Sequence, residues 1–454
     1  MAKQVVNDFS KGSIISNILR LSIPMTLAQL INVLYSIVDR IYIGRMGENS
    51  SLALTGVGVC LPIITIVIAF ANLIGMGGAP LFSIKRGEGN EKEAEAILGN
   101  SVTLLVIFGL CLTVVGLIVK RPLLYLLGAS ENTIEYAVSY LNIYALGTLF
   151  VQLTLGMNAF VTAEGFTKVS MVSVAIGAIL NIALDPIMIF GLNMGVRGAA
   201  LATVISQAVS CIIVVVFLCS KKSILRLKRK NLNIKPKVVF PCIALGTAAF
   251  IMQASESVIS VCFNSSLLKY GGDIAVGAMT ILTSVMQFAM LPLQGIAQGA
   301  QPITSYNYGA NNTERVKKTF RVLLTVSLIY SVTLWLAVML LPQFFVSIFT
   351  PETAMIEFAS KALRIYMAVM LLFGIQIACQ MTFTALGNAT SSIIVAVTRK
   401  FILLLPLIYI MPHMVSDKTM GVYLAEPVAD FIAVTFTAIL FYFQFRKAMN
   451  KIES

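Results

Sequence analysis

Long apolar stretches separated by short polar segments run through the whole chain. Twelve of them approach or exceed the length of about 20 apolar residues that a membrane-spanning helix needs. Their approximate bounds are 15–43, 51–82, 93–119, 132–165, 168–191, 196–219, 239–268, 274–305, 315–342, 355–385, 392–412 and 420–444. The alternating segments of a membrane β-barrel do not recur. The pattern therefore predicts an all-α integral membrane protein with twelve transmembrane helices.

The composition narrows the class further. Of the 454 residues, 58% are hydrophobic and 12% are charged, whereas soluble proteins are about half apolar and about a quarter charged. This excludes a soluble enzyme, a disordered protein and a secreted disulfide scaffold. The 7 cysteines lie in apolar segments without a C-x-x-C pair, so we interpret them as small buried apolar side chains. The polar start of the chain leads us to expect no cleaved signal peptide.

The net charge is +13, from 33 basic and 20 acidic residues. We interpret this excess as a signal for the orientation of the chain in the membrane and not for nucleic-acid binding. Most Lys and Arg residues, including Arg399 and Lys400, fall in segments that are cytoplasmic if the N-terminus is inside. The positive-inside rule then places both termini in the cytoplasm. The one long basic run, 221–237, is interpreted as a cytoplasmic connector, with a binding patch for anionic lipid or nucleotide as the alternative.

The two halves of the chain are related in sequence. Gly75-Met-Gly-Gly-Ala-Pro80 resembles Ala297-Gln-Gly-Ala-Gln-Pro302, which lies 222 residues later. The same offset relates three further pairs: Gly87 with Gly309, Asn90 with Asn312, and Ala163-Glu-Gly165 with Ala385-Leu-Gly387. A repeat of six helices keeps both halves in one orientation, which is a known plan of transporters with the substrate path between the halves.

The repeat also predicts how the chain divides. We expect an N-terminal six-helix lobe over 1–220 and a C-terminal six-helix lobe over 239–454. The basic cytoplasmic linker at 221–238 would join these two pseudo-symmetric bundles.

Acidic residues inside spans are the best functional candidates, because a charge at membrane depth costs at least about 2.5–3.5 kcal/mol. Asp39 lies in the outer half of the first span, with Tyr35 one turn below it on the same face. Asp185 lies in the outer half of the fifth span and shares a face with Asn181, four residues earlier. Pro186 removes a backbone donor and frees a carbonyl oxygen beside this carboxylate.

Neighbouring spans should bring further polar groups to the same depth. Counting residues from the helix ends places Thr203 level with Asp185, and Asn158 level with Asn181. We therefore expect one site in the first half, formed by Tyr35, Asp39, Asn158, Asn181, Asp185 and Thr203. The alternative is a set of unrelated interhelical hydrogen bonds.

The chemistry of this predicted site is specific. It offers hard oxygens and amides without His or Cys, which suits H⁺ or Na⁺ and excludes zinc. Two carboxylates close together in a low dielectric favour one shared proton or cation. No cofactor is expected.

The second half does not copy this site, because the 222-residue offset places Leu403 and Leu407 opposite Asn181 and Asp185. Its acid is Glu256, which lies mid-span in Gln253-Ala-Ser-Glu256. Glu256 could attract a cationic substrate or a second ion, or it could be a protonated structural acid. Glu426 and Asp430 share a helix face and remain unassigned. With one His and no nucleophile–base pair, the chain is not expected to be an enzyme.

These residues resemble the MATE (multidrug and toxic compound extrusion) transporters, and most of all their MepA-type bacterial branch. The resemblance covers nearly the whole chain. Its most specific part is Asn181-x-x-x-Asp185-Pro186 followed by Gly198-Ala-Ala-Leu-Ala-Thr203. The looser parts are Ile23-Pro24, Asp39, the Gly/Pro end of the second helix and Gln298-Gly-x-Gln301-Pro302.

The resemblance implies a fold and an activity. The fold would be a V-shaped pair of six-helix bundles in a bacterial cytoplasmic membrane, present as a monomer in this family. The activity would be efflux of organic cations, such as drugs and dyes, against inward H⁺ or Na⁺. A lipid-linked saccharide flippase of the same superfamily is the alternative, but it would need a strongly basic cavity.

The resemblance also implies roles for single residues. Asp39, Asn181, Asp185 and Thr203 match the ion site of the N-terminal lobe, with Tyr35 and Asn158 nearby. The resemblance implies that these four residues are the ligands if the ion is Na⁺. Glu256, with Gln253 beside it, matches a substrate- or ion-binding acid of one branch. That branch has a second acid in the tenth helix, where this chain has Gln376 and Gln380, so the ion coupling is expected mainly in the first half.

Overall fold

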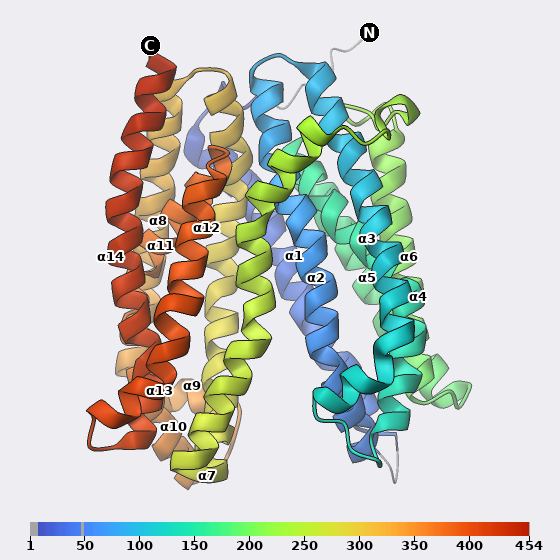
Figure 1. Cartoon of the computed structure of the whole chain (residues 1–454), viewed down its shortest axis with the longest axis vertical. Helices are drawn as coiled ribbons and strands as arrows, with labels where there is room; N and C mark the ends of the chain where they lie inside the picture. Colours follow the sequence, from blue (N-terminus) through green and yellow to red (C-terminus); the bar gives the residue numbers. More distant parts are fainter. Residues whose placement is uncertain (1–7, 47–49, 454) are drawn as a thin grey trace. The chain divides into compact units, whose positions relative to one another are not determined.

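The computed structural model describes residues 8–46 and 50–453, and every regular element in these ranges is a helix (Figure 1). The α-helices are α1 (Ile14–Ile43), α2 (Ser50–Gly87), α3 (Glu91–Leu126), α4 (Ile134–Ala163), α5 (Thr167–Pro186), α6 (Val196–Cys219), α7 (Pro236–Gly309), α8 (Thr313–Leu340), α9 (Pro342–Ser347), α10 (Thr353–Tyr366), α11 (Phe373–Ala385), α12 (Ala389–Val397), α13 (Leu405–Met414) and α14 (Lys418–Glu453). Two π-helical segments interrupt this series, at Ile187–Gly191 and Thr398–Leu404.

The twelve predicted spans are confirmed within the described ranges, although they are divided differently. Ten helices are long and apolar enough to cross a membrane, and one more span is the bent pair formed by α10 and the segment Met370–Ala385, which contains α11. The 74-residue α7 contains two spans, because Gly272 (φ 63°, ψ −161°) interrupts it and the chain turns back there (Figure 1). The protein is thus an all-α, multi-pass membrane protein.

The internal repeat corresponds to repeated turns. Gly89 (φ 74°) and Asn311 (φ 56°) are 222 residues apart, and both adopt the left-handed conformation. The residues that follow them, Asn90 and Asn312, cap α3 and α8 by accepting hydrogen bonds from the backbone N–H three residues later, at 3.2 and 3.1 Å. The repeated Asn residues are therefore helix N-caps, which satisfy backbone donors that the first turn leaves open.

The chain divides into two compact units, which we call unit 1 (mainly 23–253) and unit 2 (9–22 with 254–453). The changeovers lie inside α1 and α7. In unit 1, α4 packs against α2, α3 and α6. In unit 2, α14 packs against α10, α11 and α13. The six-helix lobes predicted from the sequence stay a prediction.

Glycines allow the first part of α7 to touch α2 backbone to backbone within unit 1. A Cβ atom at Gly246 would lie 1.7 Å from the Leu73 carbonyl oxygen, and one at Gly77 would lie 2.0 Å from the Cys242 carbonyl oxygen. No side chain fits at either position. The two helices can therefore approach this closely only because both residues are glycine.

The basic run 221–237 is docked on unit 1 through buried acidic and amide groups. The Glu164 carboxylate accepts hydrogen bonds from Ser223 Oγ at 2.9 Å and from the Ile224 and Leu225 backbone N–H groups at 3.0 and 3.1 Å. Burial raises the pKa of Glu164 above its ordinary value, although these donors act in the opposite direction. Asn100 Oδ1 accepts from the Lys235 backbone N–H at 2.6 Å. This segment is thus a fixed part of unit 1.

Candidate functional site

Unit 1 contains a cavity of about 160 Å³ between α1, α2, α4, α5 and α6. At about 30 Å³ for each water in the liquid, it has room for roughly five waters. Its walls carry apolar side chains and an unusual number of polar ones. The polar residues that line it are Asn32, Tyr35, Ser36, Asp39, Arg40, Tyr140, Tyr144, Thr154, Asn181, Thr203, Ser206, Gln207 and Ser210.

Asn181 connects two other polar residues of this site, Asp185 and Thr203. Its Nδ2 atom donates to Asp185 Oδ1 at 3.3 Å and lies 3.4 Å from Thr203 Oγ1. Asp185 is completely buried. The expected i, i+4 relation on α5 and the matching depth of Thr203 on α6 therefore both hold. The helix continues past Pro186 as the π-helical segment Ile187–Gly191.

Three oxygens of the site have no hydrogen-bond partner in the described part of the chain: Asp39 Oδ1, Asp185 Oδ2 and Asn181 Oδ1. The carboxyl groups of Asp39 and Asp185 act on each other electrostatically. Buried polar atoms are normally paired, so these oxygens have the capacity to bind a positive group. Two adjacent buried carboxyls cannot both stay ionised without one. The donor set suits H⁺ or Na⁺.

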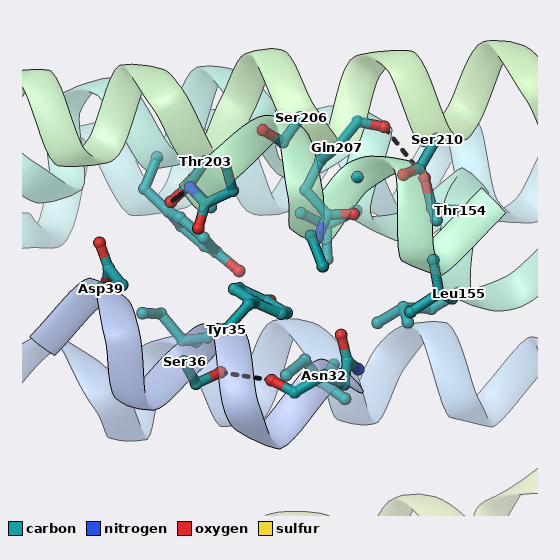
Figure 2. A pocket seen from close by; sticks show the side chains of 18 of the residues that line it. Asn32, Tyr35, Ser36, Asp39, Thr154, Leu155, Thr203, Ser206, Gln207 and Ser210 are labelled. Carbon is teal, nitrogen blue, oxygen red and sulfur yellow. Dashed lines mark hydrogen bonds between the residues drawn. The ribbon is translucent and has the colours of Figure 1, made fainter. Parts of the chain in front are cut away.

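Figure 2 shows the two walls that face each other across the cavity, with Asp39 and Tyr35 on α1 and Thr203 and Gln207 on α6. Ser206, Gln207 and Ser210 line the cavity but were not predicted as site residues. The Ser206 Oγ and Gln207 Oε1 atoms are buried without a partner in the described ranges. Their spacing after Thr203, at one and two helical turns, is a sequence signal that could have identified them.

Four predicted residues are not part of the lining of this cavity: Asp185, Asn158, Gln253 and Glu256. Asp185 adjoins the lining through its hydrogen bond with Asn181. Asn158 is buried on α4, where its Oδ1 atom accepts a hydrogen bond from Ser173 Oγ at 3.3 Å. Gln253 is the last residue of unit 1, and Glu256 belongs to unit 2. The structure therefore brings together Tyr35, Asp39, Asn181, Asp185 and Thr203, but it does not add Asn158, Gln253 or Glu256 to them.

The charge assignment counts Arg399 and Lys400 on the cytoplasmic side, although both fall within the predicted span 392–412. They lie inside the candidate span Ala389–Met414, in its π-helical segment. Both side chains are largely buried. Buried charges need acidic partners, and the sequence pattern gave no sign of these. Leaving these two residues out of the cytoplasmic count does not reverse the excess of Lys and Arg residues on the cytoplasmic side.

The MatE family model matches the chain twice, over residues 24–187 and 248–410. The two matches agree with the internal repeat. Among curated proteins, the chain is 28% identical over 429 residues to the multidrug export protein MepA of Staphylococcus haemolyticus (strain JCSC1435), with 94% of each chain covered. It is 27% identical to MepA of Staphylococcus aureus (strain N315), with 89% of this chain and 88% of the other covered.

Solved MATE structures share the fold. A MATE crystal structure in a bent conformation superposes with a TM-score of 0.92 over 98% of each chain. The outward-facing structure of a multidrug resistance MATE family transporter gives a TM-score of 0.91 over the full length of both chains. Both are 22% identical to this chain.

Proposed function

The chain belongs to the MatE family, and we propose that it is a secondary active antiporter that exports organic cations in exchange for inward H⁺ or Na⁺. Its relatives named as multidrug export proteins support the substrate class. The observation that carries the ion coupling is the cavity of unit 1. Asp39 lines it, Asp185 adjoins it through Asn181, and each of these two interacting carboxyls has one buried oxygen without a partner among the described residues.

The proposed ion site consists of Asp39 and Asp185, with Asn181 and Thr203 fixing the position of Asp185. Asn181 donates to the Asp185 carboxylate and lies within hydrogen-bonding distance of Thr203. A proton would convert one carboxyl into a donor for the other. Na⁺ would instead be bound by the carboxylate, amide and hydroxyl oxygens. Either ion removes one negative charge from the cavity.

The chemistry of the cavity lining suits an organic cation, and a drug-sized one would require the cavity to widen beyond 160 Å³. Tyr35, Tyr140 and Tyr144 line it beside Asp39, and a carboxylate with aromatic rings attracts a flat cation. Ion and drug then compete for one negative charge. Binding of the ion releases the drug outside, and release of the ion into the cytoplasm restores the charge that binds the next drug. This mutual exclusion couples the two movements during alternating access.

Proteoliposomes with an imposed pH gradient test the proposal. Adding a cationic drug should dissipate the gradient if the ion is H⁺, whereas a requirement for Na⁺ identifies Na⁺ as the ion. Asp39→Asn and Asp185→Asn should each reduce gradient-driven transport by at least about tenfold, since a coupling worth 1.4 kcal/mol corresponds to that factor.

Asp273→Asn is the matched control, because Asp273 is exposed, lies in unit 2 and is far in sequence from the cavity residues. It should transport like the unchanged protein. Full gradient-driven transport by the Asp39→Asn or Asp185→Asn protein would overturn the assignment of the ion site.

A further inference from the structure

Five charged side chains form a connected group in unit 2, outside the cavity described above. Lys400 Nζ donates to Glu256 Oε1 on α7 at 2.6 Å. Arg399 Nε donates to Asp430 Oδ1 on α14 at 2.8 Å. Arg399 Nη2 lies 3.9 Å from Glu426 Oε1, one turn before Asp430. Two adjacent residues of one π-helical segment thus reach acids on two different helices.

The charges in this group do not balance. Three carboxylates meet only two basic groups, so one negative charge is in excess when all five are ionised. The side chains of Arg399, Lys400, Glu426 and Asp430 are at most 12% exposed. These four side chains carry two positive and two negative charges, so the excess negative charge belongs to the fifth side chain, Glu256. The group is therefore short of one monovalent positive charge.

Glu256 is the member of the group that a ligand can reach. Its side chain is 56% exposed, whereas that of Lys400 is 6% exposed. Glu256 also lies mid-span on α7, where an exposed charge is tolerated facing a water-filled space and not facing lipid. A cation from solution would therefore meet the Glu256 carboxylate first, and would find it occupied by Lys400.

A second carboxylate, that of Glu426, is available as a partner for Lys400. Lys400 acts electrostatically on Glu426 as well, and Glu426 has the longest ion pair of the group, at 3.9 Å from Arg399. The neighbouring helix α11 offers a further acceptor. Gln376 lies one turn after Phe373, over whose ring the Arg399 guanidinium lies. Gln376 Oε1 is buried without a hydrogen-bond partner in the described ranges.

We propose that Lys400 is a tethered cation that occupies Glu256 until a monovalent organic cation displaces it, and that Lys400 then pairs with Glu426. In the liganded arrangement, three acids face three positive charges: the ligand on Glu256, Lys400 on Glu426, and Arg399 on Asp430. Lys400 thereby sets the affinity for the cation. The identity of the ligand as an exported organic cation rests on the proposed function.

Equilibrium binding of tetraphenylphosphonium to the full chain in nanodiscs, without an ion gradient and at fixed pH and low ionic strength, tests this inference. Lys400→Gln removes the internal competitor and should tighten binding about tenfold, within the usual range of coupling between two sites. Glu426→Gln balances the group at two acids and two bases, so it should weaken binding by a similar factor. Lys361→Gln, an exposed position of unit 2, should change nothing.

The double variant Lys400→Gln/Glu256→Gln should lose the gain in affinity. The proposal is overturned if Lys400→Gln binds no tighter, if the gain survives Glu256→Gln, or if Glu426→Gln leaves the affinity unchanged. If the Lys400→Gln protein does not fold, the tetraphenylphosphonium affinity of the Glu426→Gln protein tests the proposal. If ²²Na⁺ binding responds to these variants and tetraphenylphosphonium binding does not, the site takes an alkali ion and the proposal fails.

Repeating the measurement in the Asp39→Asn/Asp185→Asn background separates this inference from the proposed function. The tightening by Lys400→Gln should persist there, because the two sites lie in different units. Loss of gradient-driven transport without loss of this tightening would affect the ion site alone.

Discussion

Asn181 is the residue on which the geometry of the proposed ion site depends. Its amide links Asp185, on its own helix, to Thr203 on α6. Asp185 is completely buried, so its carboxylate cannot be oriented by bulk water. A hydrogen bond of this kind contributes about 0.5–1.5 kcal/mol net. The Thr203 hydroxyl thus helps to hold the amide that orients the carboxylate.

Thr203→Val removes this hydroxyl while keeping the side-chain shape. We expect gradient-driven transport to fall by about five- to tenfold, as the loss of one hydrogen bond of about 1 kcal/mol suggests. Thr113→Val is the control, since the Thr113 hydroxyl donates at 2.8 Å to the Ala145 carbonyl oxygen outside the cavity. Equal transport by the two variants would show that Thr203 has no role in the site.

The residues of the site differed in how well the sequence could identify them. Asn181 and Asp185 are four residues apart, so their contact follows from helical spacing alone. The pairs of Lys400 with Glu256 and of Arg399 with Asp430 span 144 and 31 residues. Helix packing creates these long-range pairs. The sequence pattern therefore places both basic residues in the predicted span 392–412 but does not identify their acidic partners.

At the level of elements, the structure places its irregular backbone beside charged side chains. One π-helical segment follows Asp185 and Pro186, and the other contains Arg399 and Lys400. The backbone N–H of Leu405 donates to the Lys400 carbonyl oxygen, five residues earlier. Such segments often occur at functional sites. Apolar runs predicted the existence of these helices, but they carry no signal for a π-helical turn.

The close contact between α2 and α7 within unit 1 gives a prediction about stability. Gly246→Ala would place Cβ 1.7 Å from the Leu73 carbonyl oxygen, so we expect a loss of about 1–3 kcal/mol, as in other overpacked sites. Gly58→Ala on α2 meets nothing within 4 Å. It should keep or raise the melting temperature, because Ala favours a helix over Gly.

Thermal unfolding of the purified variants in one detergent measures both effects. A Gly246→Ala protein that melts with the unchanged protein would contradict the packing described for these two helices.

At the level of the whole molecule, duplication explains the fold better than it explains the chemistry. The family model matches both halves, and the repeated turns at Gly89 and Asn311 share the same conformation. The charged groups do not repeat. Unit 1 holds a pair of interacting carboxyls at the edge of a cavity. Unit 2 instead holds the ion-paired group of Arg399 and Lys400 with three acids. Apolar runs could therefore predict the twelve spans and repeated motifs the two related halves, while each charged group had to be found separately.

The central claim is that ion and drug compete for the charge of Asp39 and Asp185. The most direct measurement is the affinity of the purified protein for a permanently charged drug as a function of pH and of Na⁺ concentration. We expect the affinity to fall as the concentration of the coupling ion rises, by up to about tenfold for each tenfold rise in that ion at full competition. The Asp39→Asn/Asp185→Asn protein should lose this dependence. Drug affinity in the unchanged protein that is independent of both pH and Na⁺ would contradict the claim.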